Sequence, residues 1–286
     1  MQETLKLKHI GTEVKPKPPL KIYALEPFDF FRGLSHRKFT TEFTIKFVNR
    51  MLKEERKEAD RTGISPEIIF LGNEISSWHM FDIDTRVVKK AAGILSKSLP
   101  KDVWVALAFN VREIRFNGSG PDERYDADKM DVQNMSYLIT PSGWKRSVKR
   151  FCSMFLEYKT VSDNLFVYEE ADKVVKHWIN IGKMLQKKEI PYISTLTPSG
   201  QRIEYRICGD IGNAPIKDEP DTITIVSAKA LGAFDYEIYG KRKAVVINDL
   251  EPHHFADSNH NFQVFGREKF TRVQSGGSEG VVFTWN

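Results

Sequence analysis

The amino-acid sequence predicts a single α/β domain built from layers of sheet and helix. Short apolar runs typical of buried strands alternate along the chain with segments whose apolar residues recur at helical spacing. Neither an internal repeat nor a convincing linker divides the chain. With 286 residues, of which 41% are hydrophobic, the chain is long enough to bury a substantial core. We therefore expect an α/β (α+β) sandwich of short strands and interspersed helices.

The first half of the chain alternates strand and helix. Residues 21–25 form a short apolar run, and residues 39–61 carry apolar side chains at near-helical spacing among many charges. Residues 67–72 contain four bulky apolar residues without a polar break, which is typical of a strand buried on both faces. The same alternation predicts a helix over residues 84–99 and a strand over residues 103–109.

The second half is expected to be richer in strands. A strand over residues 135–139 precedes a turn signalled by Pro141 and Gly143. Residues 163–188 space their apolar side chains by three and four, which predicts a helix with one apolar stripe. Further strands are expected over residues 201–207, 222–226, 244–247 and 281–284.

Charge and composition exclude several classes of protein. Residues 1–20 alternate Lys with Thr, Glu and Pro, so we expect a disordered, basic, Pro-rich tail before a domain over residues 21–286. The formal net charge of +5 is a small excess over a long chain, which speaks against nucleic acid as a partner. No segment approaches the roughly 20 apolar residues of a membrane span.

The cysteine content indicates a reducing compartment. Cys152 and Cys208 are too few for a disulfide framework, and no N-terminal stretch combines a basic head with an apolar run. These features predict a cytoplasmic protein. Cys152 lies between Phe151 and Phe155, so we interpret it as a packed core thiol.

Three residues are candidates for chemistry because each follows a predicted strand. Glu74 comes after residues 67–72, Lys149 after a strand and turn, and Cys208 after residues 201–207. Strand ends are where functional side chains collect in α/β folds. Small residues follow Cys208, and such a turn can expose a thiol and offer backbone N–H groups to an oxyanion. Taken singly, such residues are more often ordinary core or surface positions.

Taken together and in this order, these segments resemble the nitrilase superfamily of carbon–nitrogen hydrolases. The resemblance rests on the opening strand and helix, on Leu71-Gly72-Asn73-Glu74, on the aliphatic strand and Pro-x-Gly hairpin of residues 133–143, and on Ile207-Cys208-Gly209-Asp210. It implies a four-layer α-β-β-α sandwich that acts without cofactor or metal. It also implies a homodimer or a larger assembly.

The resemblance assigns roles to particular residues. Glu74 would be the general base, Lys149 the catalytic lysine and Cys208 the nucleophile. Glu157 would be the family's second active-site glutamate, and a backbone N–H near Gly209 would help to hold the oxyanion. The substrate would be a small amide or nitrile.

The sequence departs from the family pattern beside these residues. Asn73 stands where the family usually has Pro, and Gly209 stands where an aromatic or acidic residue is frequent. Lys145 is an alternative to Lys149. A helical insertion around residues 163–190 separates the lysine from the cysteine, with Trp178 in its apolar stripe. This stripe either covers the pocket, packs on the body of the sandwich away from the pocket, or forms a dimer contact.

These residue types suit cleavage of a C–N bond. An unperturbed thiol has a pKa of about 8.5, so the nucleophile needs a neighbouring base and a cation to react at neutral pH. The sequence therefore predicts an amidase-type hydrolase that works through a thioester. Two alternatives stay open: acyl transfer from the same thioester to an amine, and a binding protein that has lost activity on the same fold.

A metal site is the competing local signal. His253, His254, His260 and Asp257 lie close together in the sequence, but their Pro- and Asn-rich surroundings favour a solvated loop. We therefore predict no metal.

Overall fold

A computed structural model describes residues 17–25, 36–73, 85–114, 130–148, 192–208, 210, 220–228, 242–249 and 262–285. Within these ranges the protein is an α/β structure with two helices and twelve strands. The helices are α1 (His36–Thr62) and α2 (Thr85–Ser98). The strands are β1 (Leu20–Leu25), β2 (Glu67–Gly72), β3 (Val103–Ile114), β4 (Met130–Thr140), β5 (Gly143–Val148), β6 (Ile193–Leu196), β7 (Arg202–Ile207), β8 (Thr222–Ala228), β9 (Ala244–Asp249), β10 (Phe262–Gly266), β11 (Phe270–Ser275) and β12 (Ser278–Phe283).

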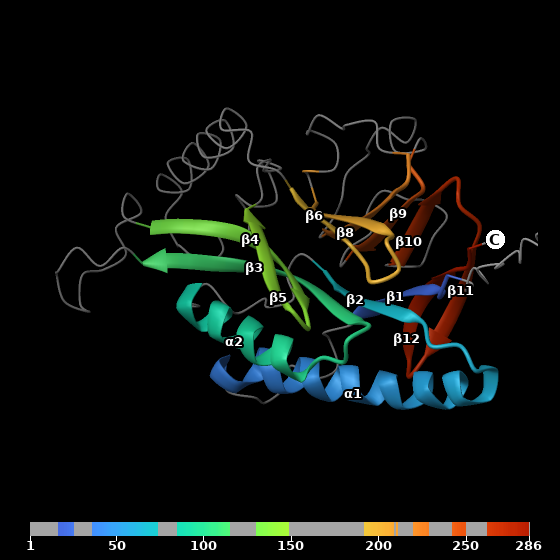
Figure 1. The fold of residues 1–286 in the computed structure, drawn as a ribbon. Coiled ribbons are helices and arrows are strands. Elements are labelled where there is room, and N and C mark those ends of the chain that lie inside the picture. Colours follow the sequence, from blue (N-terminus) through green and yellow to red (C-terminus); the bar gives the residue numbers. More distant parts are fainter. Residues whose placement is uncertain are drawn as a thin grey trace, which may run out of the picture.

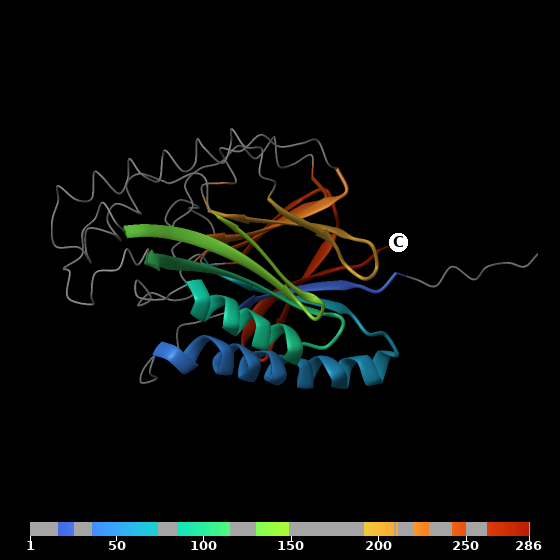
Figure 2. The ribbon, with the colours of Figure 1, turned by 60° about the vertical axis from the view of Figure 1, so that its left-hand side comes forward.

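The strands form two mixed sheets. The seven-stranded sheet has the order β11-β12-β1-β2-β3-β4-β5, and the five-stranded sheet has the order β10-β9-β8-β7-β6. Strands β1, β2 and β3 run parallel at the centre of the first sheet, as do β7, β8 and β9 in the second. Helices α1 and α2 lie on one side of the seven-stranded sheet, and the five-stranded sheet lies on its other side (Figures 1 and 2).

The apolar runs of the central strands serve two cores at once. In β2, Ile68 and Phe70 pack in the core between the helices and the sheet, whereas Ile69 and Leu71 pack between the two sheets. Successive side chains of a strand point to opposite faces, so a strand covered on both sides needs apolar residues at every position. This is why residues 67–72, predicted as a buried strand, carry no polar residue after Glu67.

A buried polar group joins α1 to the sheet. Glu55 is 5% exposed, accepts a hydrogen bond from the Tyr23 hydroxyl, and pairs with the Lys21 amine at 2.7 Å. Burial, together with the neighbouring Glu55 carboxylate, raises the pKa of Tyr23 above its usual range. The phenol therefore stays protonated and keeps donating to Glu55, which fixes α1 on β1.

Residues 17–20, which the sequence assigned to a tail, are part of the packed structure. The indole N–H of Trp285 donates to the Pro18 carbonyl at 2.9 Å, and the amines of Lys17 and Lys243 lie 4.9 and 3.8 Å from its ring centroid. Leu20 already belongs to β1 and is fully buried. Residues 17–20 are thus packed against the chain's last described residues, and the prediction of a disordered tail was wrong for them.

The other predicted elements that fall within the described residues agree with the structure in type. The strands expected over residues 103–109 and 135–139 are longer than predicted, because they pair with each other along their length as β3 and β4. The predicted turn at Pro141 joins β4 to β5, and β5, β6, β10 and β11 were not predicted as strands. The expected helix over residues 163–188 lies outside the described residues, as do Cys152 and Trp178.

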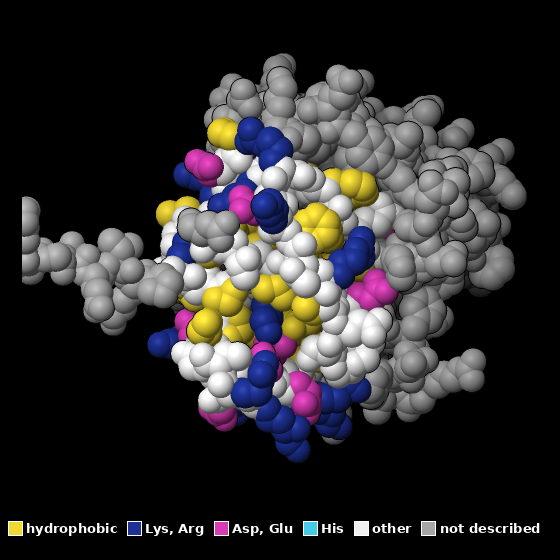
Figure 3. Space-filling model, turned by 90° about the vertical axis from the view of Figure 1, so that its right-hand side faces the viewer, with side chains coloured by type: hydrophobic (Ala, Val, Ile, Leu, Met, Phe, Trp, Pro, Cys, Tyr) yellow, Lys and Arg dark blue, Asp and Glu magenta, His cyan; other side chains and the backbone are white. Residues whose placement is uncertain are grey.

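Surface charge on the described residues is mixed. On the face shown in Figure 3, Lys and Arg side chains lie at several separate places among apolar and acidic ones. Neither described helix is long and apolar enough to cross a membrane.

Candidate active site

The parallel strands of both sheets end on the same side of the sandwich. In the seven-stranded sheet β1 and β2 end in register, with Leu25 beside Gly72. In the five-stranded sheet the last residue of β7, Ile207, lies beside Ser227 of β8, and Ser227 lies beside Asn248 of β9. In α/β proteins, the carboxyl ends of parallel strands are where sites form.

Three buried hydrogen bonds join these strand ends, two of them between the two sheets and one between β7 and β8. The Ser227 hydroxyl donates to the Gly72 carbonyl at 2.5 Å, and the Asn248 amide donates to the Leu71 carbonyl at 2.6 Å. The Tyr205 and Ser227 hydroxyls lie 2.7 Å apart. Because the single Ser227 proton is directed at Gly72, Tyr205 is the donor in this pair. The end of β2 is therefore fixed against β7, β8 and β9.

Cys208 occupies the first position after β7, as the sequence predicted. Its backbone has φ +35°, which is unusual for a residue with a Cβ, and its N–H donates to the Ser227 carbonyl at 2.9 Å. Backbone strain of this kind gathers at functional sites and costs about 1–3 kcal/mol. The bond to Ser227 also means that the Cys208 N–H is not a donor for an oxyanion.

The sequence predicted that a turn would expose the Cys208 thiol, and the structure differs from this prediction. Cys208 is only 3% exposed and packs in a cluster with Ala108 of β3 and Val226 of β8. The residue thus belongs to the packed interior at the strand ends.

The strained backbone of Cys208 leads to a stability prediction. At an ordinary buried strand position, replacing Ala by Gly costs about 0.5–1 kcal/mol. At φ +35° glycine is the less strained residue, so its disadvantage relative to alanine should disappear. We therefore expect Cys208→Gly to be at least as stable as Cys208→Ala in urea denaturation. Ala108→Gly, in the same cluster, is the control and should destabilise by the ordinary amount. A Cys208→Gly variant that is less stable than Cys208→Ala by about 1 kcal/mol contradicts the strain.

The remaining predicted site residues lie outside the described residues. These are Glu74, Lys149, Glu157 and Gly209. The strands that precede Glu74 and Lys149, β2 and β5, run in the same direction, because β4 is antiparallel to both β3 and β5. Both strands therefore end on the side of the sheet where Cys208 follows β7.

The alternative lysine, Lys145, lies away from this side. Its amine donates to the Ser194 carbonyl at 3.3 Å, and Ser194 pairs with Glu204, four residues before Cys208. At about 3.3 Å per residue this is about 13 Å along the strand. Lys145 is therefore not the cation beside Cys208.

A buried charged group that sequence reasoning missed holds the segment after Cys208. Arg206 is 2% exposed, contacts Glu204, and donates to the Asp210 carbonyl at 3.1 Å. Arg242 also reaches Glu204, at 3.2 Å, and donates to Thr224 at 2.7 Å. The Arg206 guanidinium lies 4.3 Å from the centre of the Tyr192 ring. Arg206 thus fixes the backbone two residues beyond the thiol.

Among the described residues no group of three His, Cys, Asp or Glu side chains could hold a metal ion. His253, His254, His260 and Asp257 lie outside them. Comparison with protein-family models and with curated proteins found no match to this chain.

Proposed function

We propose that the protein is a cysteine-dependent hydrolase of the nitrilase type, which cleaves a non-peptide C–N bond in a small amide or nitrile. Cys208 is the nucleophile, Glu74 the general base and Lys149 the cation, with Glu157 as a second glutamate. The proposal includes a four-layer α-β-β-α sandwich for the whole domain.

The burial pattern of the five-stranded sheet supports the four-layer arrangement. Strands β8 and β9 are buried at every position, on the face toward the seven-stranded sheet and on the face away from it. A sheet with both faces buried lies inside a layered structure rather than at its surface. The helices on the seven-stranded sheet supply the opposite outer layer (Figure 2).

The observation that carries the proposal is the setting of Cys208. A cysteine with φ +35° directly follows a parallel strand, and Ser227 hydrogen-bonds both to its N–H and to the end of β2. Glu74 follows that end of β2 by two residues. A structural core cysteine requires neither the strained backbone nor the link to this strand.

The reaction on an amide proceeds in two halves. Glu74 takes the thiol proton, and the Cys208 sulfur bonds to the carbonyl carbon, whose oxygen becomes negative. Lys149 and a backbone N–H at or after Gly209 hold that oxygen, each donor being worth about 3 kcal/mol. The C–N bond then breaks, and Glu74 gives its proton to the leaving amine.

The second half releases the acid. Glu74 takes a proton from water, and the water oxygen bonds to the thioester carbon. The C–S bond breaks, and the proton on Glu74 returns to the sulfur. The products are an amine and a carboxylic acid, and one carboxylate serves as base, acid and base again.

Mass spectrometry of the acylated protein tests the proposal. Trypsin cleaves the chain so that Cys208 lies in the peptide of residues 207–217 and Cys152 in that of residues 151–159. Incubation with a panel of small amides and nitriles should release amine or ammonia and add the acyl mass to peptide 207–217, removable with hydroxylamine. Acylation of peptide 151–159 alone, or none across the panel, contradicts the proposal.

A further inference from the structure

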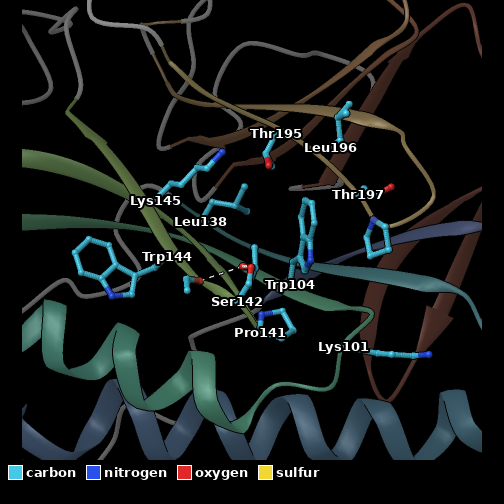
Figure 4. A pocket seen from close by; sticks show the side chains of 13 residues that line it. Lys101, Trp104, Leu138, Pro141, Ser142, Trp144, Lys145, Thr195, Leu196 and Thr197 are labelled. Carbon is cyan, nitrogen blue, oxygen red and sulfur yellow. Dashed lines mark hydrogen bonds between the residues drawn. The ribbon is translucent and has the colours of Figure 1, made fainter.

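A pocket of about 550 Å³ opens between the edges of the two sheets. It lies between the β4–β5 turn and the β6–β7 turn, as Figure 4 shows. The β6–β7 turn precedes β7, whereas Cys208 follows it, so the six residues of β7 separate the two sites by about 20 Å. The volume is in the range of small-molecule sites. This pocket therefore has no part in the proposed chemistry at Cys208.

Hydrogen bonds fix both walls of the pocket. Ser199 of the β6–β7 turn donates its N–H and its hydroxyl to Glu67 at 2.5 and 2.8 Å, which ties this turn to the start of β2. Within the same turn, the Thr197 N–H donates to the Gln201 carbonyl at 2.8 Å. On the other wall the Thr140 hydroxyl donates to the Gly143 carbonyl at 3.1 Å. A site with fixed walls loses little free energy to ordering when a ligand binds.

The interior of the pocket is apolar, and the indole N–H of Trp104 is a donor in it that no described residue uses. Trp104, which is 6% exposed, and Leu138 lie inside it, and in Figure 4 the Trp104 indole stands between Leu138 and Thr197. Within the part of the chain that the structure describes, the Trp104 indole N–H donates to no acceptor. A flat apolar group would stack on the face of this indole, whereas the N–H, which lies in the ring plane, is open to a separate acceptor at the ring edge.

The charge at the rim is positive. The lining residues in the described ranges include Lys101 and Lys145 but no Asp or Glu. The Lys145 ammonium, which has three N–H donors, makes one long bond, to Ser194 at 3.3 Å. Figure 4 shows Lys145 pointing toward Thr195 at the rim, whereas Lys101 extends away from the other lining side chains. Lys145 is thus the cation placed to meet a bound anion.

We propose that this pocket binds a small organic anion with a flat aromatic body. The body lies against Trp104, and the anionic group lies at Lys145. The proposal is independent of the hydrolase function.

Binding of 2-naphthoate and its uncharged isostere 2-acetylnaphthalene, a ketone without a C–N bond, to the full chain, followed by calorimetry, tests the charge. Naphthoate should bind one to one and about two- to fivefold more tightly than the ketone, the size of an exposed ion pair. Lys145→Gln should abolish this preference. Lys101→Gln, which removes the same charge from a side chain pointing away, should preserve it. Equal affinity for the two probes, no binding at millimolar concentration, or a preference that survives Lys145→Gln overturns the proposal.

A second pair of variants tests the location. Trp104→Phe removes part of the stacking ring, and should weaken both probes about two- to tenfold. If this buried substitution prevents folding, Ser142→Trp, which fills the pocket from an exposed turn residue, should abolish binding. Cys208→Ala should bind both probes as the wild type does, so a failure of the hydrolase proposal leaves this test intact. Probe affinity that is lost in Cys208→Ala and unchanged in Ser142→Trp contradicts a site at this pocket.

Discussion

Replacing Cys208 by Ala should lower turnover of any substrate of this protein by at least about a thousandfold. The thioester requires the sulfur, and an alanine methyl group can neither attack the carbonyl carbon nor leave it. The peptide of residues 207–217 should then carry no acyl mass after incubation with substrate. Ammonia release and mass spectrometry measure the two effects on the same sample.

Cys152→Ala is the matched control for this loss. It removes the other thiol of the chain and leaves the peptide of residues 207–217 unchanged, so turnover should stay within about threefold of wild type. Both variants replace a cysteine by alanine. Comparing them therefore separates the effect of losing the nucleophile from the effect of losing a packed sulfur atom. Wild-type turnover by Cys208→Ala, or loss of turnover in Cys152→Ala, would reject Cys208 as the nucleophile.

Strands with a clear pattern of apolar residues could be predicted from the sequence, whereas half-exposed strands at the edges of the sheets could not. The strands β2 and β9 read as apolar runs because both of their faces are buried. Strand β11 is the edge of its sheet, and most of its residues are exposed, so its sequence lacks an apolar face. Strand β6 has only four residues and is half-exposed, which leaves too short a pattern to recognise.

The polar side of β7 shows why part of the site was missed. Glu204 and Arg206 alternate with Ile203, Tyr205 and Ile207, which is the pattern of a strand with one face in water. In the structure both faces are buried, and the charges are held by ion pairs with each other and with Arg242. Such pairing joins residues distant in sequence, so a single strand does not reveal it.

The backbone of Cys208 was also beyond sequence reasoning. A positive φ is usually signalled by Gly or Asn, and here the glycine is the next residue, Gly209. The position of Cys208 at a strand end followed from the apolar pattern of residues 201–207. Its conformation depends on tertiary bonds, among them the one from its N–H to Ser227.

Ser227→Ala should slow acylation of Cys208 by about 10- to 100-fold. The Ser227 hydroxyl donates to Gly72 and accepts from Tyr205, while the Ser227 carbonyl accepts from Cys208. Removing the hydroxyl releases the end of β2, and hence the strand leading to Glu74, from the strand that carries the nucleophile. A displacement of about 1 Å between reacting groups can cost about a hundredfold in rate. The rate of acyl-mass gain on the peptide of residues 207–217 measures the effect.

Asn248→Ala separates this positioning role from a general loss of stability. Its amide makes a comparable buried bond to the same strand, at Leu71, but Asn248 lies on β9, one strand further from Cys208. Each variant loses a buried hydrogen bond and should be destabilised by about 1–3 kcal/mol in urea denaturation. Acylation in Asn248→Ala should nevertheless stay within about threefold of wild type, and Ser227→Thr, which keeps a hydroxyl, should recover most of the rate. Equal slowing of acylation in Ser227→Ala and Asn248→Ala would mean that Ser227 only stabilises the fold. In that case the Ser227 bond, which is nearer to the nucleophile, would affect the acylation rate no more than the Asn248 bond does.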